Sequence, residues 1–417
     1  MKKRSLFKQD KAFSSWAIVG ALALVMTGFY GAQFSFGIFL KPILEEFGWT
    51  RAMTSGAISI VSGVAGLSGI LMGRLTDRYG ARMLITIGAL LGGLGYLLLS
   101  QISSLWQLYV YFGVTVGICI GSAWTPINAT VSKLFDEKRV LALGITNSGI
   151  TAGRILLPPI VAYVTTGYQW RQACIMLAFI VWAVAIPAVM LLGRNRSQGA
   201  AGLPHDISTS DSKGSEVGKP IKVKQLSATE AVRTVPFWMI AATGYVAAAG
   251  FFFVSVHIVA YATDRGIDAT TAALLLSFMG GISILARLSV AQVNVMIGSR
   301  ATLFLSLLLQ ALALLLLTQA ASLWMLFALG AVYGLGFGCC GTIRMSMASE
   351  FFGVGSIGAI IGLTSVAWSI GGMTGPIMAG YIFDLTRSYN IAFIAGGLLM
   401  VMGMVASLFL KPPRRIT

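Results

Sequence analysis

Long apolar segments recur along the whole chain and are separated by short polar connections. A helix rises 1.5 Å per residue, so about 20 apolar residues cross the hydrocarbon core of a bilayer. The pattern predicts an all-α membrane protein with twelve transmembrane helices. We expect them at residues 16–40, 52–75, 83–102, 105–132, 140–165, 170–192, 235–262, 269–292, 301–319, 322–346, 355–383 and 390–410.

One polar segment divides the twelve predicted helices into two groups of six. Residues 193–233 are rich in Ser, Gly and Lys, and this composition provides nothing from which a core is built. We therefore expect a six-helix bundle over residues 1–192, a cytoplasmic linker over 193–233 and a second six-helix bundle over 234–417. Transporters built from two bundles hold their substrate midway between the halves.

Composition agrees with this fold class. Hydrophobic residues make up 56% of the chain, charged residues 11%, and the mean hydropathy is +0.82. A soluble chain carries roughly 25% charged residues. The net charge of +16 comes from basic residues scattered among short loops, which is typical of the positive-inside bias and not of a nucleic-acid surface. With both termini in the cytoplasm, 23 of the 30 Lys and Arg residues, Arg344 among them, are expected on the cytoplasmic side.

Arg287 lies inside the apolar run 269–292, with no acid close to it in the sequence. A charged side chain at bilayer depth costs a few kcal/mol or more, so it usually faces a cavity and has a function. A guanidinium without a carboxylate partner in the protein suits a carboxylate that arrives from outside. Arg287 is therefore predicted to bind an organic anion.

Arg154 is a second arginine within a predicted span. Asn147, Thr151, Arg154 and Pro158 follow one another at spacings of four, three and four, so they share one face of the helix. Two interpretations remain open. Arg154 binds a second group of the substrate, such as the other carboxylate of a dianion, or it is held by helix-end carbonyls or by Asn147 and touches no substrate.

The loop after the second predicted helix, residues 73–82, reads GRLTDRYGAR. It closely resembles the G-x-L-x-D-R-x-G-R-R loop of the major facilitator superfamily. The resemblance implies the two-bundle fold, monomeric function and a cluster that latches the two bundles in one conformational state. The residues that match are Gly73, Asp77, Arg78, Gly80 and Arg82.

Two further segments are similar to signatures of the monocarboxylate transporter family and its bacterial oxalate/formate-exchanger-like relatives. They are YGAQFSFGIFLKP at 30–42, continuing to Arg51, and KLFDEKRVLALGITNSG at 133–149, which includes Lys138 and Arg139. Arg287, in ILARL at 284–288, matches the family arginine that binds the substrate carboxylate. The resemblance implies substrates of the lactate or pyruvate type, a bacterial inner membrane, and a gating role for Lys138 and Arg139.

The chain departs from the mammalian pattern at two residues of the proton-coupling machinery. Ser283 stands where those transporters have an acid, and Phe34 stands where they have a lysine. His257 is then the one candidate near the membrane that titrates at physiological pH, although a packed or hydrogen-bonded histidine is the competing interpretation. Proton symport, anion exchange and uniport all remain open.

Several other residues are candidates to line the substrate cavity, and bundle packing is the alternative for each. They lie near an expected break of the first helix or near aromatic positions of later helices: Tyr30, Gln33, Phe34, Trp124, Tyr333, Phe337 and Trp368.

The sequence thus predicts a secondary active transporter of small organic anions that works by alternating access. A dicarboxylate or oxalate-type exchanger that uses both arginines, and an exporter of hydrophobic compounds, are the alternatives within transport. Neither a nucleotide-binding loop nor a metal cluster, nucleophile elbow or paired carboxylate is present in the sequence, which argues against an ATP-driven pump and a membrane enzyme. No cofactor is expected.

Overall fold

The structure, a computed structural model, describes residues 2–135, 138–199, 227–320, 322–353 and 357–410. Every regular element in these ranges is helical, which confirms the all-α prediction. In chain order the elements are α1 (Lys2–Phe34), α2 (Phe36–Phe47), α3 (Arg51–Tyr79), α4 (Ala81–Leu99), α5 (Leu105–Leu108), η1 (Tyr109–Val114), α6 (Thr115–Leu134), α7 (Arg139–Tyr168), α8 (Trp170–Gly199), α9 (Ala228–Val232), α10 (Val235–Thr263), α11 (Ala269–Leu317), α12 (Leu323–Phe352), α13 (Ile357–Thr386) and α14 (Tyr389–Leu408).

The described helices account for all the predicted crossings. Ten stretches are long and apolar enough to span a membrane. One of them, α11, contains two crossings because Gly298 interrupts it with φ 80° and ψ 162°, a backbone conformation that favours glycine. The helix α7 is 30 residues long, contains Arg154 and two prolines, and corresponds to the predicted span 140–165.

Two local features differ from the plain sequence pattern. The first crossing breaks at Ser35, between α1 and α2, where the Ser35 hydroxyl donates to the Gly31 carbonyl at 2.8 Å. The helix α8 runs on to Gly199, and α9 lies at the other end of the segment predicted as a linker, so the linker is helical at both ends. Residues 200–226, the middle of that segment, lie outside the described residues.

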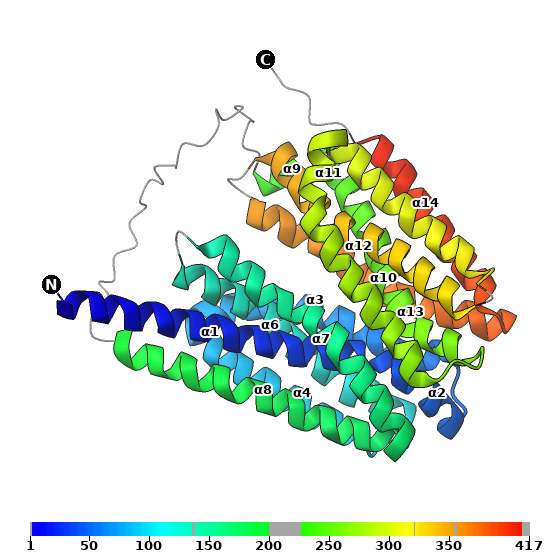
Figure 1. Cartoon of the computed structure of the whole chain (residues 1–417), viewed down its shortest axis with the longest axis horizontal. Coiled ribbons are helices and arrows are strands. Elements are labelled where there is room, and N and C mark those ends of the chain that lie inside the picture. Colours follow the sequence, from blue (N-terminus) through cyan, green and yellow to red (C-terminus); the bar gives the residue numbers. More distant parts are fainter. Residues whose placement is uncertain (1, 136–137, 200–226, 321, 354–356, 411–417) are drawn as a thin grey trace.

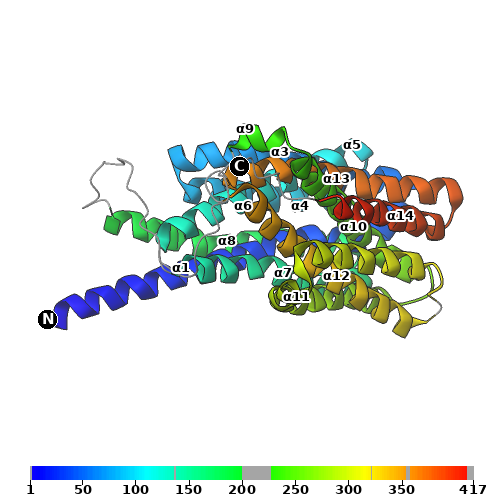
Figure 2. The ribbon, with the colours of Figure 1, turned by 90° about the horizontal axis from the view of Figure 1, so that it is seen from above.

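The helices α1–α8 form one bundle and α10–α14 the other (Figure 1). The two bundles draw together at the end where α2 lies and separate toward the end that carries both chain termini. In Figure 2, seen from above, the second bundle lies toward the viewer and overlaps the first, and the N-terminal part of α1 extends beyond both. Below, the joined end is called the closed end and the other the open end.

The contact between α3 and α13 shows where the bundles separate. At the closed end the Ser55 hydroxyl donates to the Pro376 carbonyl at 3.0 Å, and further along a Cβ at Gly66 would lie 2.9 Å from Ser369 Cβ. Ile70 follows one turn later on the same face and is 57% exposed. The bundles are thus packed from the closed end to Gly66 and apart beyond it.

Candidate functional site

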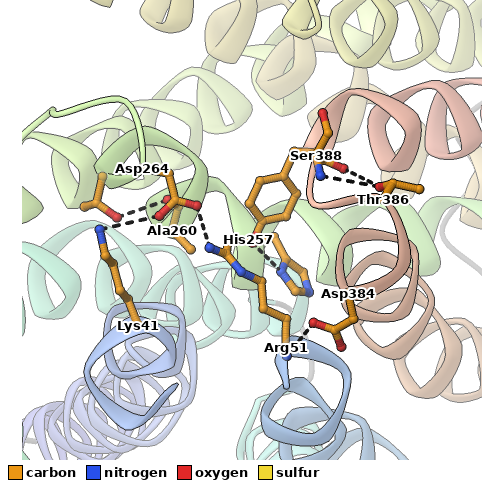
Figure 3. A network of polar contacts seen from close by, with 10 residues as sticks. Lys41, Arg51, His257, Ala260, Asp264, Asp384, Thr386 and Ser388 are labelled. Atoms are coloured by element: carbon orange, nitrogen blue, oxygen red, sulfur yellow. Dashed lines mark hydrogen bonds and ion pairs between the residues drawn. The ribbon is translucent and has the colours of Figure 1, made fainter. Parts of the chain in front are cut away.

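Arg51, at the start of α3, joins the two bundles at the closed end (Figure 3). The backbone N–H groups of Arg51 and Ala52 donate to the two Asp384 carboxylate oxygens at 2.9 and 2.8 Å. The Arg51 guanidinium donates to Asp264 at 2.5 Å and to the Tyr389 hydroxyl. Asp264, Asp384 and Tyr389 all belong to the second bundle, so these bonds hold the closed end shut.

His257 belongs to the same closed-end network and is fully buried. Its Nε2 lies 3.0 Å from the Pro376 carbonyl oxygen and its Nδ1 lies 3.0 Å from the Tyr389 hydroxyl. A carbonyl oxygen only accepts, so Nε2 carries the proton and Nδ1 accepts from Tyr389. The geometry is that of a hydrogen-bonded histidine. The structure does not bring His257 together with Arg154 or Arg287, and its role in coupling stays a prediction.

Arg154 lies where α7 crosses α11, at the interface of the two bundles. The Ser277 hydroxyl of α11 donates to the Ile155 carbonyl of α7 at 2.7 Å. Gly280 of α11 lies beside the arginine, since a Cβ there would be in van der Waals contact with Arg154 Cδ at 3.7 Å. The Arg154 side chain is only 4% exposed, so this cation is almost completely removed from water.

Aromatic rings surround the Arg154 guanidinium. Its central carbon lies 4.7 Å from the Phe251 ring centroid and 5.9 Å from those of Phe34 and Phe337. The rings of Phe251 and Phe337 stack at 4.4 Å. Ring faces stabilise a cation but accept no conventional hydrogen bond, and the buried Arg154 Nε has no partner among the described residues. The hydroxyl of Tyr333, close enough to interact with Arg154, is likewise without a partner.

Arg287 lies two turns beyond Gly280 on α11, on the face that meets α7. Its side chain is exposed, and it is close enough to Arg154 for the two charges to repel each other. No hydrogen bond or ion pair joins Arg287 to another residue in the described ranges. The structure therefore brings the two predicted arginines together, one buried and one accessible.

Among the described residues, no acid lies in the interior around these arginines. The carboxylates whose side chains are described all lie at or near helix ends: Glu45, Glu46, Glu230, Asp264, Asp268, Glu350 and Asp384. Two guanidinium groups without a counter-charge produce a positive potential in the middle of the membrane region. A positive potential of this kind favours negative over positive ions.

Asn147 has a different partner from the one that the sequence suggested. Its Nδ2 donates to Asn128 Oδ1 at 2.9 Å, which ties α7 to α6, and its own Oδ1 is buried without a partner. Asn147 therefore does not hold the Arg154 guanidinium. Asn128 donates in turn to the Trp124 carbonyl at 2.7 Å, and the Trp124 side chain is 44% exposed.

The remaining predicted lining residues gather near Arg154. Trp368 lies 6.4 Å from Phe337, measured between ring centroids, and Tyr30 lies 6.3 Å from Phe34. Gln33 is 3% exposed and faces a small cavity that Phe34 also lines. Phe251, which makes the closest ring contact with Arg154, was missed because nothing in the run of three phenylalanines at 251–253 distinguishes it.

The predicted latch residues lie at the open end. Gly80 has a φ of 82° and turns the chain between α3 and α4, while the Arg82 guanidinium packs where a Cβ at Gly193 would stand, 2.7 Å away. Gly73 lies in α3, and the Arg78 guanidinium lies over the neighbouring Tyr79 ring. Lys138 and Arg139 are exposed, and the Asp77 side chain lies outside the described part. Their latching role stays a prediction, because the bundles are apart here.

Arg344 does not lie at the cytoplasmic surface, where the count of basic residues placed it. The count assigned Arg344 to the cytoplasmic side, but the structure places it inside α12, nine residues before the helix is capped by Gly353. Its guanidinium carbon lies 5.3 Å from the Trp368 ring centroid. The sequence signal was present, since residue 344 falls within the predicted span 322–346.

Comparison with known proteins agrees with this architecture. The chain matches the Major Facilitator Superfamily over residues 22–296 and 293–417. Monocarboxylate transporter 13 of Rattus norvegicus is 25% identical over 394 residues, which cover 93% of this chain and 87% of that protein. Monocarboxylate transporter 2 of Homo sapiens is 26% identical over 409 residues, which cover 94% and 84%.

A solved structure shares the fold. It is that of a bacterial homologue of the human lysosomal transporter Spinster, in an inward-facing and unoccupied conformation, with a TM-score of 0.75, 15% identity and coverage of 97% of this chain and 99% of that one. The helical architecture, the apolar spans and the family match together lead to one conclusion. The chain belongs to the major facilitator superfamily and is a multi-pass membrane transporter.

Proposed function

We propose that this protein is a secondary transporter of small organic anions, in the first place monocarboxylates of the lactate or pyruvate type, and that Arg287 binds the substrate carboxylate. One observation carries the proposal: Arg287 is an accessible arginine in the middle of a membrane region whose described interior contains no acid. A planar guanidinium presents paired N–H donors that match a carboxylate. The relatives named monocarboxylate transporters support the same substrate class.

The shape of the molecule supports alternating access as the proposed mechanism. In the described conformation an anion reaches Arg287 from the open end, while the closed-end network around Arg51 blocks the other side. Transport requires that network to break as the open end closes, a rocking of two rigid bundles. The basic residues near the open end and the termini support a cytoplasmic orientation of this end. The proposed membrane is a bacterial inner membrane, as the family resemblance implies.

A dicarboxylate is the second candidate substrate, and Arg154 is the observation that favours it. Arg154 lies close enough to Arg287 for their charges to interact, and its Nε donor has no partner. A dianion with two carboxylates separated by a short chain would offset both positive charges, whereas a monocarboxylate offsets only one. Proton symport and anion exchange stay open as modes of coupling, since Ser283 and Phe34 replace the acid and the lysine of the mammalian relatives' pattern.

The test is uptake of labelled lactate, pyruvate and oxalate into proteoliposomes by the wild type, Arg287→Gln and Arg154→Gln. We expect saturable uptake in the wild type and a loss of about 100-fold or more in Arg287→Gln, the scale of a lost charged hydrogen bond in a low dielectric. Loss of oxalate uptake alone in Arg154→Gln would establish the dicarboxylate site. An imposed pH gradient separates symport, which it accelerates, from exchange, which instead needs a counter-anion inside the vesicle.

The exporter alternative predicts the opposite pattern. A transporter of hydrophobic compounds would take up none of these acids and would keep its activity in Arg287→Gln. If the wild type is folded and transports no acid, the proposed function is wrong.

A further inference from the structure

We propose that Arg344 forms a second carboxylate-binding subsite, between the Arg287 site and the open end, through which the anion passes on its way in or out. The inference rests on the proposed function, because it assumes that the passing ligand is a carboxylate. It assigns a role to a basic residue that the family patterns quoted above do not include.

The depth of Arg344 follows from the packing of α12 against the first crossing of α11, the part before Gly298, because these two helices run side by side in the same direction. A Cβ at Gly334 would lie 2.7 Å from the Met279 carbonyl oxygen, and one at Gly338 would lie 2.7 Å from Ala286 Cβ. Arg344 comes six residues after Gly338 and is therefore level with a point about one turn, ~5 Å, beyond Arg287 toward the open end.

The direction of Arg344 follows from its helix face. Phe337, Gly341 and Arg344 are spaced by four and three residues and so share one face of α12. Phe337 belongs to the aromatic group under Arg154. At Gly341, between them, a Cβ would meet no atom within 4 Å. Open space thus lies beside this face, with the Arg154 group at its inner end and Arg344 at its outer end.

The guanidinium of Arg344 is held in place but lacks an acceptor. A Cβ at Gly244 of α10 would clash with its Nη1 and lie 3.1 Å from its central carbon, so the guanidinium fits only because residue 244 is a glycine. The Trp368 ring centroid lies 5.3 Å from the central carbon. Its Nη1 is buried and has no hydrogen-bond partner, and no ion pair joins Arg344 to a described acid. A fixed guanidinium with a free donor in a desolvated place is prepared for an anion that visits it.

With two arginine sites in succession, the anion binds at Arg287 and at Arg344 in turn on its way through the protein. An anion that leaves Arg287 toward the open end loses one guanidinium partner and gains another about one turn away, so it is not released directly into an apolar wall. The same subsite raises the local concentration of anions that enter from this end. It therefore acts on substrate recognition from the open end and not on recognition from the closed end.

The experiment measures transport separately from each side, in proteoliposomes with one orientation of the protein. We expect Arg344→Gln to raise the KM for lactate about tenfold when lactate is supplied at the open-end side, with the KM from the other side within about twofold of wild type. Arg344→Lys should raise the KM less than Arg344→Gln, since lysine keeps the positive charge but lacks the paired N–H donors of a guanidinium. The control is Met345→Gln, at an exposed neighbour on a different face, which should behave as wild type.

A second measurement does not depend on transport. Lactate binding beside Trp368 should change tryptophan fluorescence in the purified protein, and this change should be absent in both Trp368→Phe and Arg344→Gln. An open-side KM for Arg344→Gln equal to that of Met345→Gln, or a fluorescence change that persists in it, would overturn the subsite. If only the subsite is wrong, the wild type still transports lactate and Arg287→Gln does not; if the proposed function is wrong, the wild type transports no acid at all.

Discussion

Arginines occur in two regions of the bundle interface, and their surroundings are opposite. At the closed end Arg51 is bonded to Asp264, to Asp384 through its backbone, and to Tyr389, and its side chain is 11% exposed. In the interior Arg154 and Arg287 have no bond to any acid in the described residues, although Arg154 is almost completely buried. The first arrangement holds two bundles together, and the second leaves positive charge for a ligand to offset.

The difference teaches how to distinguish a structural arginine from a binding one. A charge that the protein itself pairs stabilises one conformation, and breaking the pair is costly. A charge that the protein leaves unpaired at membrane depth costs stability in the empty state, and that cost is recovered when an anion binds. The comparison predicts that adding a partner in the interior and removing one at the closed end both disturb transport, for different reasons.

The largest effect is expected from giving Arg287 an acid of its own. Ile284 lies one turn before Arg287 and is 36% exposed, so Ile284→Glu places a carboxylate within reach of the guanidinium. That carboxylate competes with the substrate, and we expect lactate affinity to fall on the order of 100-fold at neutral pH. Binding to the purified protein measures it, with Ile284→Gln as the neutral control. Equal affinities in the two variants would show that residue 284 does not face the anion site.

A smaller effect is expected from removing the Arg51 side chain. In Arg51→Gln, Asp264 keeps its ion pair with Lys41 at 3.4 Å. The Tyr389 hydroxyl loses the hydrogen bond that the Arg51 guanidinium donates to it. Because the pair is partly exposed, we expect a loss of about 1–2 kcal/mol from the closed arrangement, a shift of roughly tenfold in the population of the two conformations. Spin labels on α3 and α13 at the closed end should report longer distances. Unchanged distances would contradict a holding role for this network.

The smallest effect is expected on the stability of α11, the helix that contains Arg287, when its N-cap is removed. Asp268 accepts the Thr271 N–H at 2.8 Å, and the hydrogen bonds from Thr271 lower the pKa of Asp268 below its ordinary value. A depressed folded-state pKa means that this stabilisation is present above the unfolded pKa and is lost as pH falls through the folded one.

Asp268→Ala should therefore cost about 1 kcal/mol at neutral pH, the ordinary worth of a helix N-cap, whereas Asp268→Asn keeps a neutral cap. Thermal unfolding at neutral and acid pH measures the difference. The wild type should lose part of its advantage over Asp268→Ala in acid while Asp268→Asn keeps its own. If the wild type and Asp268→Asn showed the same pH dependence of thermal unfolding, the ionised Asp268 carboxylate would not be the stabilising cap.

The sequence predicted the helices well because membrane crossing imposes one simple requirement, an apolar run of sufficient length. It also singled out Arg154 and Arg287, since a charge inside such a run stands out. It did not predict the closed-end network, because Arg51 and Asp384 are 333 residues apart and meet only when the bundles pack. Arg344 was counted with the cytoplasmic residues because it lies two residues from the end of its predicted span, while α12 continues to Phe352.

The central claim is that Arg287 binds the substrate carboxylate, and a direct binding measurement tests it best. Calorimetric titration of purified protein with lactate should give a Kd for the wild type that rises at least tenfold in Arg287→Gln and less in Arg287→Lys. Arg171→Gln is the matched control, because Arg171 is an arginine paired with Glu46 at 2.7 Å and away from the site. A rise confined to the Arg287 variants is the predicted result. An unchanged Kd in a folded Arg287→Gln protein would contradict the account.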